Sequence, residues 1–313
     1  MKIPVVFWHG NSFNLVNFGL FATVGSMLGY SIIFFYLHSR GIQVNRFCWE
    51  IVFILTLFNL FFAKLYAIFS IGKSNYFRNF LYHLNETSFY QQGGIIGTIL
   101  GTLLLYLLLD IPMALLGDAV CFGGIATLFL GRLGCYFYGC CTGKPIKGKF
   151  AIIYTDSNAK ICRDDPRLLN TPLVPVQLIA SAVDFLIFGL CCFVSIKYPF
   201  SGLIIIIFFF SVNLKRIAIQ RFRLKPASNK IPYRWVAFAL IISLVLIIMF
   251  FHHNGDLFFE YTPSEVSFTL FKYFQFLVSD VNILVSLILV GVINFAAYGI
   301  HGRRVGTHLN LSV

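Results

Sequence analysis

The sequence predicts an all-α polytopic membrane protein with seven to eight transmembrane helices and a small extramembrane head between helices four and five. Of its 313 residues, 58% are hydrophobic and only 12% are charged, and its mean hydropathy is +0.82. A soluble domain of this length could not bury so much apolar surface. The apolar runs are continuous rather than alternating with a period of two, which argues against a transmembrane β-barrel.

Eight continuous apolar runs predict the membrane helices. The first begins too late for a removable signal peptide and lacks a small-residue cleavage site, so we interpret it as a signal anchor. The seventh is the weakest because it is barely 17 residues long, whereas about 20 residues are needed to span a bilayer. We treat residues 1–313 as a single transmembrane domain. The eight runs are 15–37, 49–71, 93–116, 118–138, 176–196, 199–219, 235–251 and 281–300.

Two polar segments lie between these runs. Segment 143–175 contains a β-like run at 150–154, so we predict that it forms the small inserted head, with a plain loop as the alternative. Segment 252–280 is predicted to be an interfacial loop, with a short amphipathic piece at about 266–278 that lies at the membrane surface.

The chain is strongly basic, with a formal net charge of +12. Nucleic acid is the general interpretation of a basic chain. Here, however, the lysines and arginines lie in short loops beside helix ends, where attraction to anionic lipid headgroups explains them more economically. We therefore predict an anionic phospholipid as partner, and no nucleic acid.

The loop charges also bear on orientation. Of the 24 lysines and arginines, 18 fall on the face that carries the N-terminus and segment 143–175, and 4 fall on the opposite face. The positive-inside rule would place the basic face in the cytoplasm.

Arg132 is the residue that points most directly to function. It lies in one of the most apolar stretches of the chain, within the segment GRLGCYFYGCCTGK at 131–144. An ionised guanidinium at membrane depth is costly unless it faces a polar cavity or a bound anion. The arginine and the four glycines of this segment therefore predict a site for a phosphate-bearing lipid.

Asp118 cannot neutralise Arg132 directly. It precedes the arginine by fourteen residues, which corresponds to about 21 Å along a straight helix. We predict instead that Asp118 is an N-cap at the start of the fourth helix or a partner for a polar group of another helix. Arg132 then needs another counter-charge, and a lipid phosphate would serve.

The segment QQGGIIG at 91–97 opens the third helix. Glycines at a helix N-terminus expose backbone N–H groups that favour a negative ligand. A glycine-lined packing seam between helices would explain the same residues. Both interpretations stay open at this point.

A second cluster of cations ends the sixth helix. Arg216 and Gln220 share one face of the helix, and a planar guanidinium can hold two phosphate oxygens at once. Snorkelling to the interface explains Arg221 and Arg223 well. It explains Arg216 less well, because Asn213 precedes it within an apolar run.

The eight cysteines predict no metal site by their spacing. Cys135 with Cys140 or Cys141 does not match the C-x2-C pattern of zinc sites, and no second pair with histidines follows. A thiol nucleophile is an alternative, but no adjacent histidine would activate it. We predict inert cysteines, no metal and no cofactor. His9 and His83 are the loop histidines on the Arg132 face that could act as a base.

The order of these features resembles the bacterial prolipoprotein diacylglyceryl transferase family over roughly residues 15–225. The segment GRLG at 131–134, followed by Gly139 and Gly143, is similar to the family signature of a glycine, an arginine and a glycine-rich turn. Upstream, FYQQGGIIG at 89–97 is similar to the family's segment ending in His-Gly-Gly-x-Ile-Gly.

Three further positions carry the resemblance. Asp118 occupies the position of the family's aspartate, PVQL at 175–178 resembles the family's His-Pro-x-Gln-Leu-Tyr-Glu, and Arg216 falls where a second essential arginine is expected. The resemblance implies transfer of a diacylglyceryl group from phosphatidylglycerol to the cysteine thiol of a lipoprotein precursor. It implies catalytic roles for Arg132, Arg216 and Gln92. The implied substrate-binding residues are Gly93, Gly94, Gly134, Gly139, Gly143, Asp118, Gln177 and Gln220.

Several positions depart from the family pattern. The cations and glycines remain, whereas most groups that would handle a proton or position a thiol are replaced. Gln92 stands where the family has a histidine proposed as a base, and an amide cannot take up a proton at physiological pH. The other departures are Cys135 and Cys140 for asparagine and glutamate, Val174 for histidine, Ile179 and Ala180 for the Tyr-Glu pair, Phe18 for tyrosine, Lys64 for arginine and Gln220 for an acid.

Three hypotheses follow. The chain is a transferase that acts on phosphatidylglycerol and a thiol or another acceptor, a non-catalytic phospholipid-binding or scaffold protein that has lost the base, or a lipid transporter. A transporter would be expected to show pseudo-symmetric halves, which the sequence does not show. The resemblance further implies a multi-pass protein of the bacterial inner membrane with an extracytoplasmic active face, against the loop charges. We expect a monomer.

Overall fold

The structure, a computed structural model, confirms a polytopic all-α membrane fold. It describes residues 5–70, 89–148, 150–198, 201–224, 241, 269–302 and 305. Within this part of the chain, seven helices are long and apolar enough to cross a membrane. They are α1 (Asn17–Ser39), α2 (Cys48–Ser70), α4 (Gln91–Leu108), α5 (Met113–Tyr138), α7 (Val176–Lys197), α8 (Leu203–Gln220) and α11 (Val281–Gly299).

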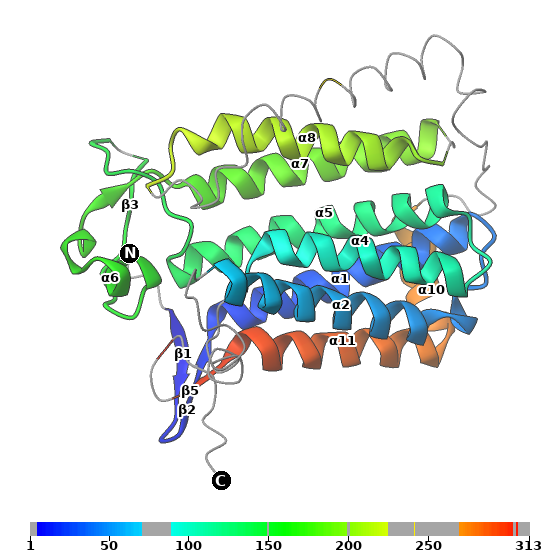
Figure 1. Cartoon of the computed structure of the whole chain (residues 1–313), viewed down its shortest axis with the longest axis horizontal. Coiled ribbons are helices and arrows are strands. Elements are labelled where there is room, and N and C mark those ends of the chain that lie inside the picture. Colours follow the sequence, from blue (N-terminus) through cyan, green and yellow to red (C-terminus); the bar gives the residue numbers. More distant parts are fainter. Residues whose placement is uncertain are drawn as a thin grey trace.

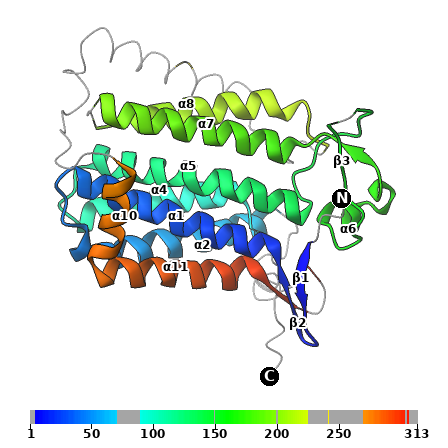
Figure 2. The ribbon, with the colours of Figure 1, turned by 180° about the vertical axis from the view of Figure 1, so that it is seen from behind.

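The membrane helices run alongside one another, with α7 and α8 as a separate layer above α5 (Figure 1). The most extensive helix contacts are those of α1 with α5, α2 with α4, α1 with α11 and α5 with α7. A short 3-10 helix (Val44–Arg46) joins α1 to α2 at one end of the bundle. Near that end the amphipathic helix α10 (Leu270–Ser279) crosses the bundle where α11 begins (Figure 2).

Glycines allow the helices to approach at backbone distance. A Cβ added to Gly123 of α5 would lie 2.3 Å from the carbonyl oxygen of Gly29 of α1. A Cβ added to Gly19 of α1 would lie 2.1 Å from the Cα of Gly299 of α11. Such close packing drives helix association in lipid, where burial of apolar surface supplies little. The glycines thus fix α1 between α5 and α11.

The opposite end of the bundle carries small β-structures, and we call it the head-side end. Strands β1 (Val6–His9), β2 (Phe13–Val16) and β5 (Ile300–Gly302) form an antiparallel sheet in the order β1-β2-β5. This sheet ties the start of α1 to the end of α11.

The head follows α5 along the chain. It consists of strand β3 (Ile152–Ile153), helix α6 (Lys160–Asp164), a 3-10 helix (Pro166–Leu168) and strand β4 (Pro172–Leu173), with β3 and β4 paired. The strand is shorter than the β-like run 150–154. The side chains of Tyr154 and Leu173 pack in one buried cluster with Val5 and Val16, which joins the head to the first sheet.

Two predicted helix positions need correction or lie outside the described residues. The break between the third and fourth helices falls at Leu109 to Pro112, not at residue 117, because proline fixes the backbone and starts a new helix. Of the run 235–251, all residues except 241 lie outside the described part of the chain. In segment 252–280 the described part forms α10, close to the amphipathic piece expected at 266–278.

Asp118 therefore lies inside α5 rather than at its start. Its carboxylate is fully buried and accepts hydrogen bonds from the backbone N–H groups of Gly202 (2.7 Å) and Ile205 (2.9 Å), and from the hydroxyl of Tyr36 (3.4 Å). Asp118 thus caps the N-terminus of α8 from a neighbouring helix. Of the two predictions made for it, the partner of another helix is confirmed and the cap of its own helix is wrong.

We predict that Asp118→Ala lowers the free energy of unfolding by about 1–3 kcal/mol, because two buried N–H groups lose their acceptor. Thermal unfolding in detergent micelles measures the change. Asp110→Ala is the matched control, since Asp110 is exposed in the connection between α4 and α5. An unchanged melting temperature for Asp118→Ala would contradict the capping role.

Candidate functional site

Four membrane helices bring polar side chains to the head-side end. The helices α4 and α7 begin there, and α5 and α8 end there (Figure 1). The segments after α5 and α8 are joined by backbone hydrogen bonds from Lys144 N to Phe222 O (2.9 Å) and from Leu224 N to Thr142 O (3.1 Å). The end of the glycine-rich segment is thereby paired with the residues that directly follow α8.

Arg132 lies in the last two turns of α5, partly buried. Its guanidinium donates a hydrogen bond to Oε1 of Gln91 at the start of α4 (3.1 Å). Its Nε atom is buried and has no hydrogen-bond partner. The hydrogen bond of Arg132 is thus accepted by Gln91, the neighbour of the predicted site residue Gln92.

A buried ion pair between α7 and α8 lies close to Arg132. The ammonium group of Lys215 contacts a carboxylate oxygen of Asp184, and their side chains are 6% and 0% exposed. The second carboxylate oxygen of Asp184 is buried without a hydrogen-bond partner. The charges of Asp184 and Lys215 both act on Arg132. Sequence reasoning missed Asp184, although a carboxylate within an apolar run was a signal for it.

Arg216 is partly buried and next to Lys215 on α8. The charges that act on it include those of Arg132 and Arg223. Arg221 lies over the ring of Phe222 (5.6 Å) and donates to the carbonyl of Ala218 (3.3 Å). Arg132 and Arg216 thus belong to one electrostatic cluster.

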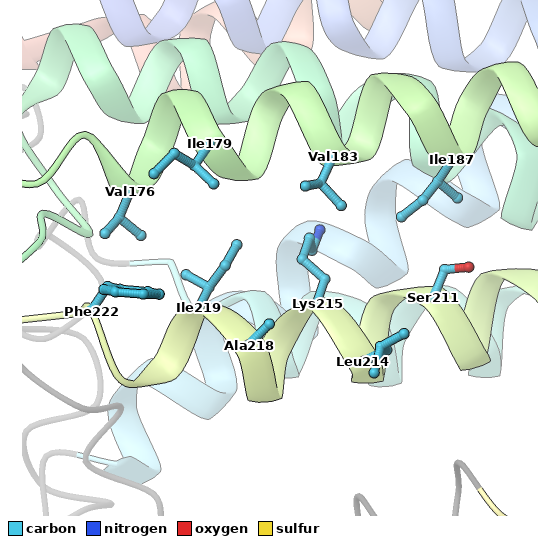
Figure 3. A pocket seen from close by; sticks show the side chains of 10 residues that line it. All are labelled: Val176, Ile179, Val183, Ile187, Ser211, Leu214, Lys215, Ala218, Ile219 and Phe222. Atoms are coloured by element: carbon cyan, nitrogen blue, oxygen red, sulfur yellow. The ribbon is translucent and has the colours of Figure 1, made fainter. Parts of the chain in front are cut away.

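An apolar cavity of about 380 Å³ lies between α7 and α8. Figure 3 shows the ammonium group of Lys215 pointing from α8 toward α7 in the middle of this cavity. Most other side chains around it are aliphatic or aromatic, so the cavity can accept a hydrocarbon chain beside a cation. The lining residues are Val176, Ile179, Val183, Ile187, Ser211, Leu214, Lys215, Ala218, Ile219 and Phe222.

The glycines of α4 form a packing seam. A Cβ on Gly93 would lie 2.2 Å from the carbonyl oxygen of Phe62 on α2, and one on Gly97 would lie 2.1 Å from that of Phe58. Gly94 faces Asn59, whose amide donates to the Gly94 carbonyl (3.1 Å). Of the two interpretations that the sequence left open, the structure supports helix packing.

Three of the four glycines of segment 131–144 also have structural roles. Gly134 packs against Phe18 and Phe21 of α1, and Gly143 packs against Val174. Gly139 ends α5 with a positive φ of 73° and contacts Ala159 of the head. These contacts, rather than approach of a headgroup, account for their lack of a side chain. A Cβ added to Gly131, beside Arg132, would meet nothing within 4 Å.

Gln177 supports the turn that follows α5. Its side chain is 1% exposed, and its amide donates to the carbonyl of Cys140 (2.8 Å) and to the hydroxyl of Tyr154 (3.3 Å). Tyr154 in turn donates to the carbonyl of Tyr136 (2.7 Å), and burial raises the pKa of its phenol. Gln177 is therefore placed to position the turn.

Three of the eight cysteines converge at the same turn. The Sγ atoms of Cys135, Cys140 and Cys141 all lie within 4.8 Å of one another. Hydrogen bonds from the other two thiols lower the pKa of Cys141 well below its usual range, and the positive charges of Arg132 and Arg223 act in the same direction. The spacing of these residues had given no sign of such a cluster.

Other candidate residues lie apart from this cluster or contribute only backbone. Asp118 caps α8 at the far end of the bundle. Gln220 accepts a hydrogen bond from the N–H of Arg223 through its backbone carbonyl (3.3 Å). His9 shares a hydrogen bond with Asn14 in the β1-β2 hairpin (2.9 Å). His83 lies outside the described residues.

Comparison with known proteins identifies the family of this chain. A family model described as prolipoprotein diacylglyceryl transferase matches residues 4–253. The chain belongs to this family. The phosphatidylglycerol–prolipoprotein diacylglyceryl transferase of Clostridium tetani (strain Massachusetts / E88) is 26% identical over 175 residues, which cover 44% of this chain and 68% of that protein. The family resemblance inferred from the sequence is thereby confirmed.

We predict that Gly93→Ala destabilises the protein by about 1–3 kcal/mol, because the added methyl group collides with the backbone of α2. Gly131→Ala is the matched control and should melt like the wild type, since its Cβ enters open space. Thermal unfolding of both variants in detergent is the measurement. A Gly93→Ala variant with wild-type stability but lost phospholipid binding would favour a ligand site at this glycine instead.

Proposed function

We propose that this protein is a membrane transferase that binds the phosphate of phosphatidylglycerol between Arg132 and Arg216. It passes the diacylglyceryl group to a cysteine thiol, as in a lipoprotein-precursor peptide, or to another acceptor. The family membership and the name of the Clostridium tetani relative support this class of reaction. We further propose that it works as a monomer in the bacterial inner membrane.

The observation that carries the proposal is the excess of positive charge at the head-side end. The charge of Arg132 acts there on Lys215 and Arg216, and that of Arg223 acts on Arg216. Asp184 neutralises Lys215. Cations held together at membrane depth repel unless an anion joins them. A phosphodiester group would supply that charge, and two guanidinium groups could each hold its oxygens in bidentate fashion.

The cavity between α7 and α8 supports a lipid rather than a soluble phosphate. Its lining is mostly apolar and includes Lys215, the neighbour of Arg216. A diacyl lipid could place a hydrocarbon chain between the two helices while its phosphate stays with the arginines. A soluble phosphate ester would leave this apolar surface unused.

The reaction requires a thiolate to attack the glyceryl carbon while the carbon–oxygen bond to the phosphate breaks. The arginines would stabilise the charge that develops on the departing glycerol phosphate. Neither Gln91 nor Gln92 can remove the thiol proton. We propose Gln91 as a positioning residue for Arg132, through their hydrogen bond, and retain Gln92 as a hydrogen-bond donor to the substrate.

Arg132→Ala should reduce transfer at least about tenfold, because a charge-assisted hydrogen bond contributes roughly 1.5–3 kcal/mol. The assay follows label from phosphatidylglycerol into a lipoprotein-precursor peptide with purified protein. Arg216→Ala should behave in the same way. Arg46→Ala, an exposed arginine at the other end of the bundle, should retain activity.

Two results of this assay would contradict the proposal. Wild-type protein that binds phosphatidylglycerol without any turnover on thiol, glycerol or glycan acceptors would overturn the transferase and favour a phospholipid-binding scaffold. Full activity of Arg132→Ala would leave the transferase standing and overturn the role of Arg132 in binding the phosphate.

We also propose that the head-side end faces away from the cytoplasm, as in the family, although the loop charges favour the reverse. A cysteine placed at Lys160 in the head should react with an impermeant maleimide in intact cells. A cysteine placed at Arg46 should react only after lysis. Peptide mass spectrometry separates these sites from the native cysteines, and the opposite labelling pattern would place the basic end in the cytoplasm.

A further inference from the structure

The thiols of Cys135, Cys140 and Cys141 form a cluster that the lipid site does not explain. Their Sγ atoms lie within 4.8 Å of one another, and all three residues are partly buried. Cys135 belongs to the last turn of α5, and the other two follow its end. Three thiols that converge in this way are typical of a site for a soft metal ion.

The backbone after α5 is bent in the way that brings the thiols together. Gly139 adopts a left-handed conformation with φ of 73°, and the N–H of Cys140 returns to the carbonyl of Cys135 (3.2 Å). Cys141 also has a positive φ, of 56°. For a residue with a Cβ, this left-handed conformation costs roughly 1–2 kcal/mol. Such strained residues are concentrated at functional sites.

Neighbouring elements hold this turn in place. The N–H of Ile161 in the head donates to the carbonyl of Gly139 (3.0 Å), and the amide of Gln177 donates to the carbonyl of Cys140 (2.8 Å). The Oε1 atom of Gln177 is buried beside the turn without a hydrogen-bond partner. The three cysteines are thus positioned by α5, α7 and the head together, as the ligands of a metal ion need to be.

We propose that Cys135, Cys140 and Cys141 bind one d10 metal ion, Zn²⁺, as thiolates. Zinc–sulfur bonds of about 2.3 Å place the sulfur atoms roughly 3.8 Å apart, and the three Sγ atoms already lie within 4.8 Å of one another. Three thiolates and a divalent ion carry one net negative charge. Arg132, whose charge acts on all three cysteines, offsets it. The proposal replaces the prediction of inert cysteines and no metal, which was drawn from cysteine spacing. Spacing alone could not reveal the left-handed turn that brings the three thiols together.

Three protein ligands leave the fourth position of a tetrahedral zinc ion open. A thiol that binds there loses its proton to water, because a metal-coordinated thiol is deprotonated. This consequence rests on the transferase proposed above. The resulting thiolate would attack the glyceryl carbon, and glycerol phosphate would leave with the electron pair of the broken carbon–oxygen bond. The site would thereby replace the proton acceptor that Gln92 cannot be.

Metal binding is tested on the full-length protein, without lipid or acceptor. The reduced wild type is incubated with Zn²⁺, desalted and analysed by elemental mass spectrometry, and with Co²⁺ it is followed by absorption. We expect about one zinc per chain and the sulfur-to-cobalt charge-transfer band of a tetrahedral thiolate site. The variant Cys135→Ser, Cys140→Ser, Cys141→Ser should lose at least about nine-tenths of the metal. The matched control is Cys191→Ala, Cys192→Ala, a vicinal pair in the middle of α7, which should retain it.

A second measurement needs no variant and so does not depend on how the triple variant folds. Zn²⁺ should protect Cys135, Cys140 and Cys141 of the wild type from alkylation, as read by peptide mass spectrometry, and leave Cys192 unprotected. Wild-type protein that retains no zinc, or equal alkylation with and without zinc, would overturn the site. Zinc binding without diacylglyceryl transfer would leave the metal site standing and count against the transferase alone.

Discussion

Close contact between helix backbones at glycine is the constraint on which the rest of this structure depends. Lipid tails are as apolar as the side chains, so an apolar side chain gains little free energy by moving from lipid into a helix interface. Helices therefore associate through complementary shape and small residues. Gly29 and Gly123 join α1 to α5, Gly19 and Gly299 join α1 to α11, and Gly93 and Gly97 join α4 to α2. The first of these contacts fixes the position of α5 against α1. The arginine and the three cysteines near its end therefore have a fixed position against which α4, α7 and α8 bring their own polar groups.

The sequence predicted the spans well and their ends less well. A continuous apolar run identifies a helix because the bilayer selects for it, but the run 93–116 continues through the break between α4 and α5. Pro112 was the local signal that separated them. The part played by Asp118 could not be read from α5 alone, because its partners belong to the start of α8, more than eighty residues later.

Sequence reasoning singled out Arg132 and Arg216, which the structure places in one electrostatic cluster, but it did not find the residues around them. Arg132 and Arg216 were found because a charge in an apolar run is costly wherever it lies. The choice between Gln91 and Gln92 depends on the rotation of α4 about its axis, which packing against α2 decides. The pairing of Asp184 with Lys215 and the convergence of the cysteines depend on tertiary contacts and on a left-handed turn. The rotation of α4, the ion pair and the cysteine cluster cannot be predicted from the spacing of residues along the sequence.

The buried pair of Asp184 and Lys215 has a consequence for biogenesis. Its partners belong to two consecutive helices, and each helix alone would carry an uncompensated charge into the bilayer. A charged residue at the centre of a helix raises the apparent free energy of membrane insertion by about 2.5–3.5 kcal/mol. We expect α7 and α8 to partition from the translocon together, as a neutral helical hairpin, rather than one after the other. In the fold, α7 and α8 lie together as one layer on α5 (Figure 1), as expected for a hairpin that docks as a unit.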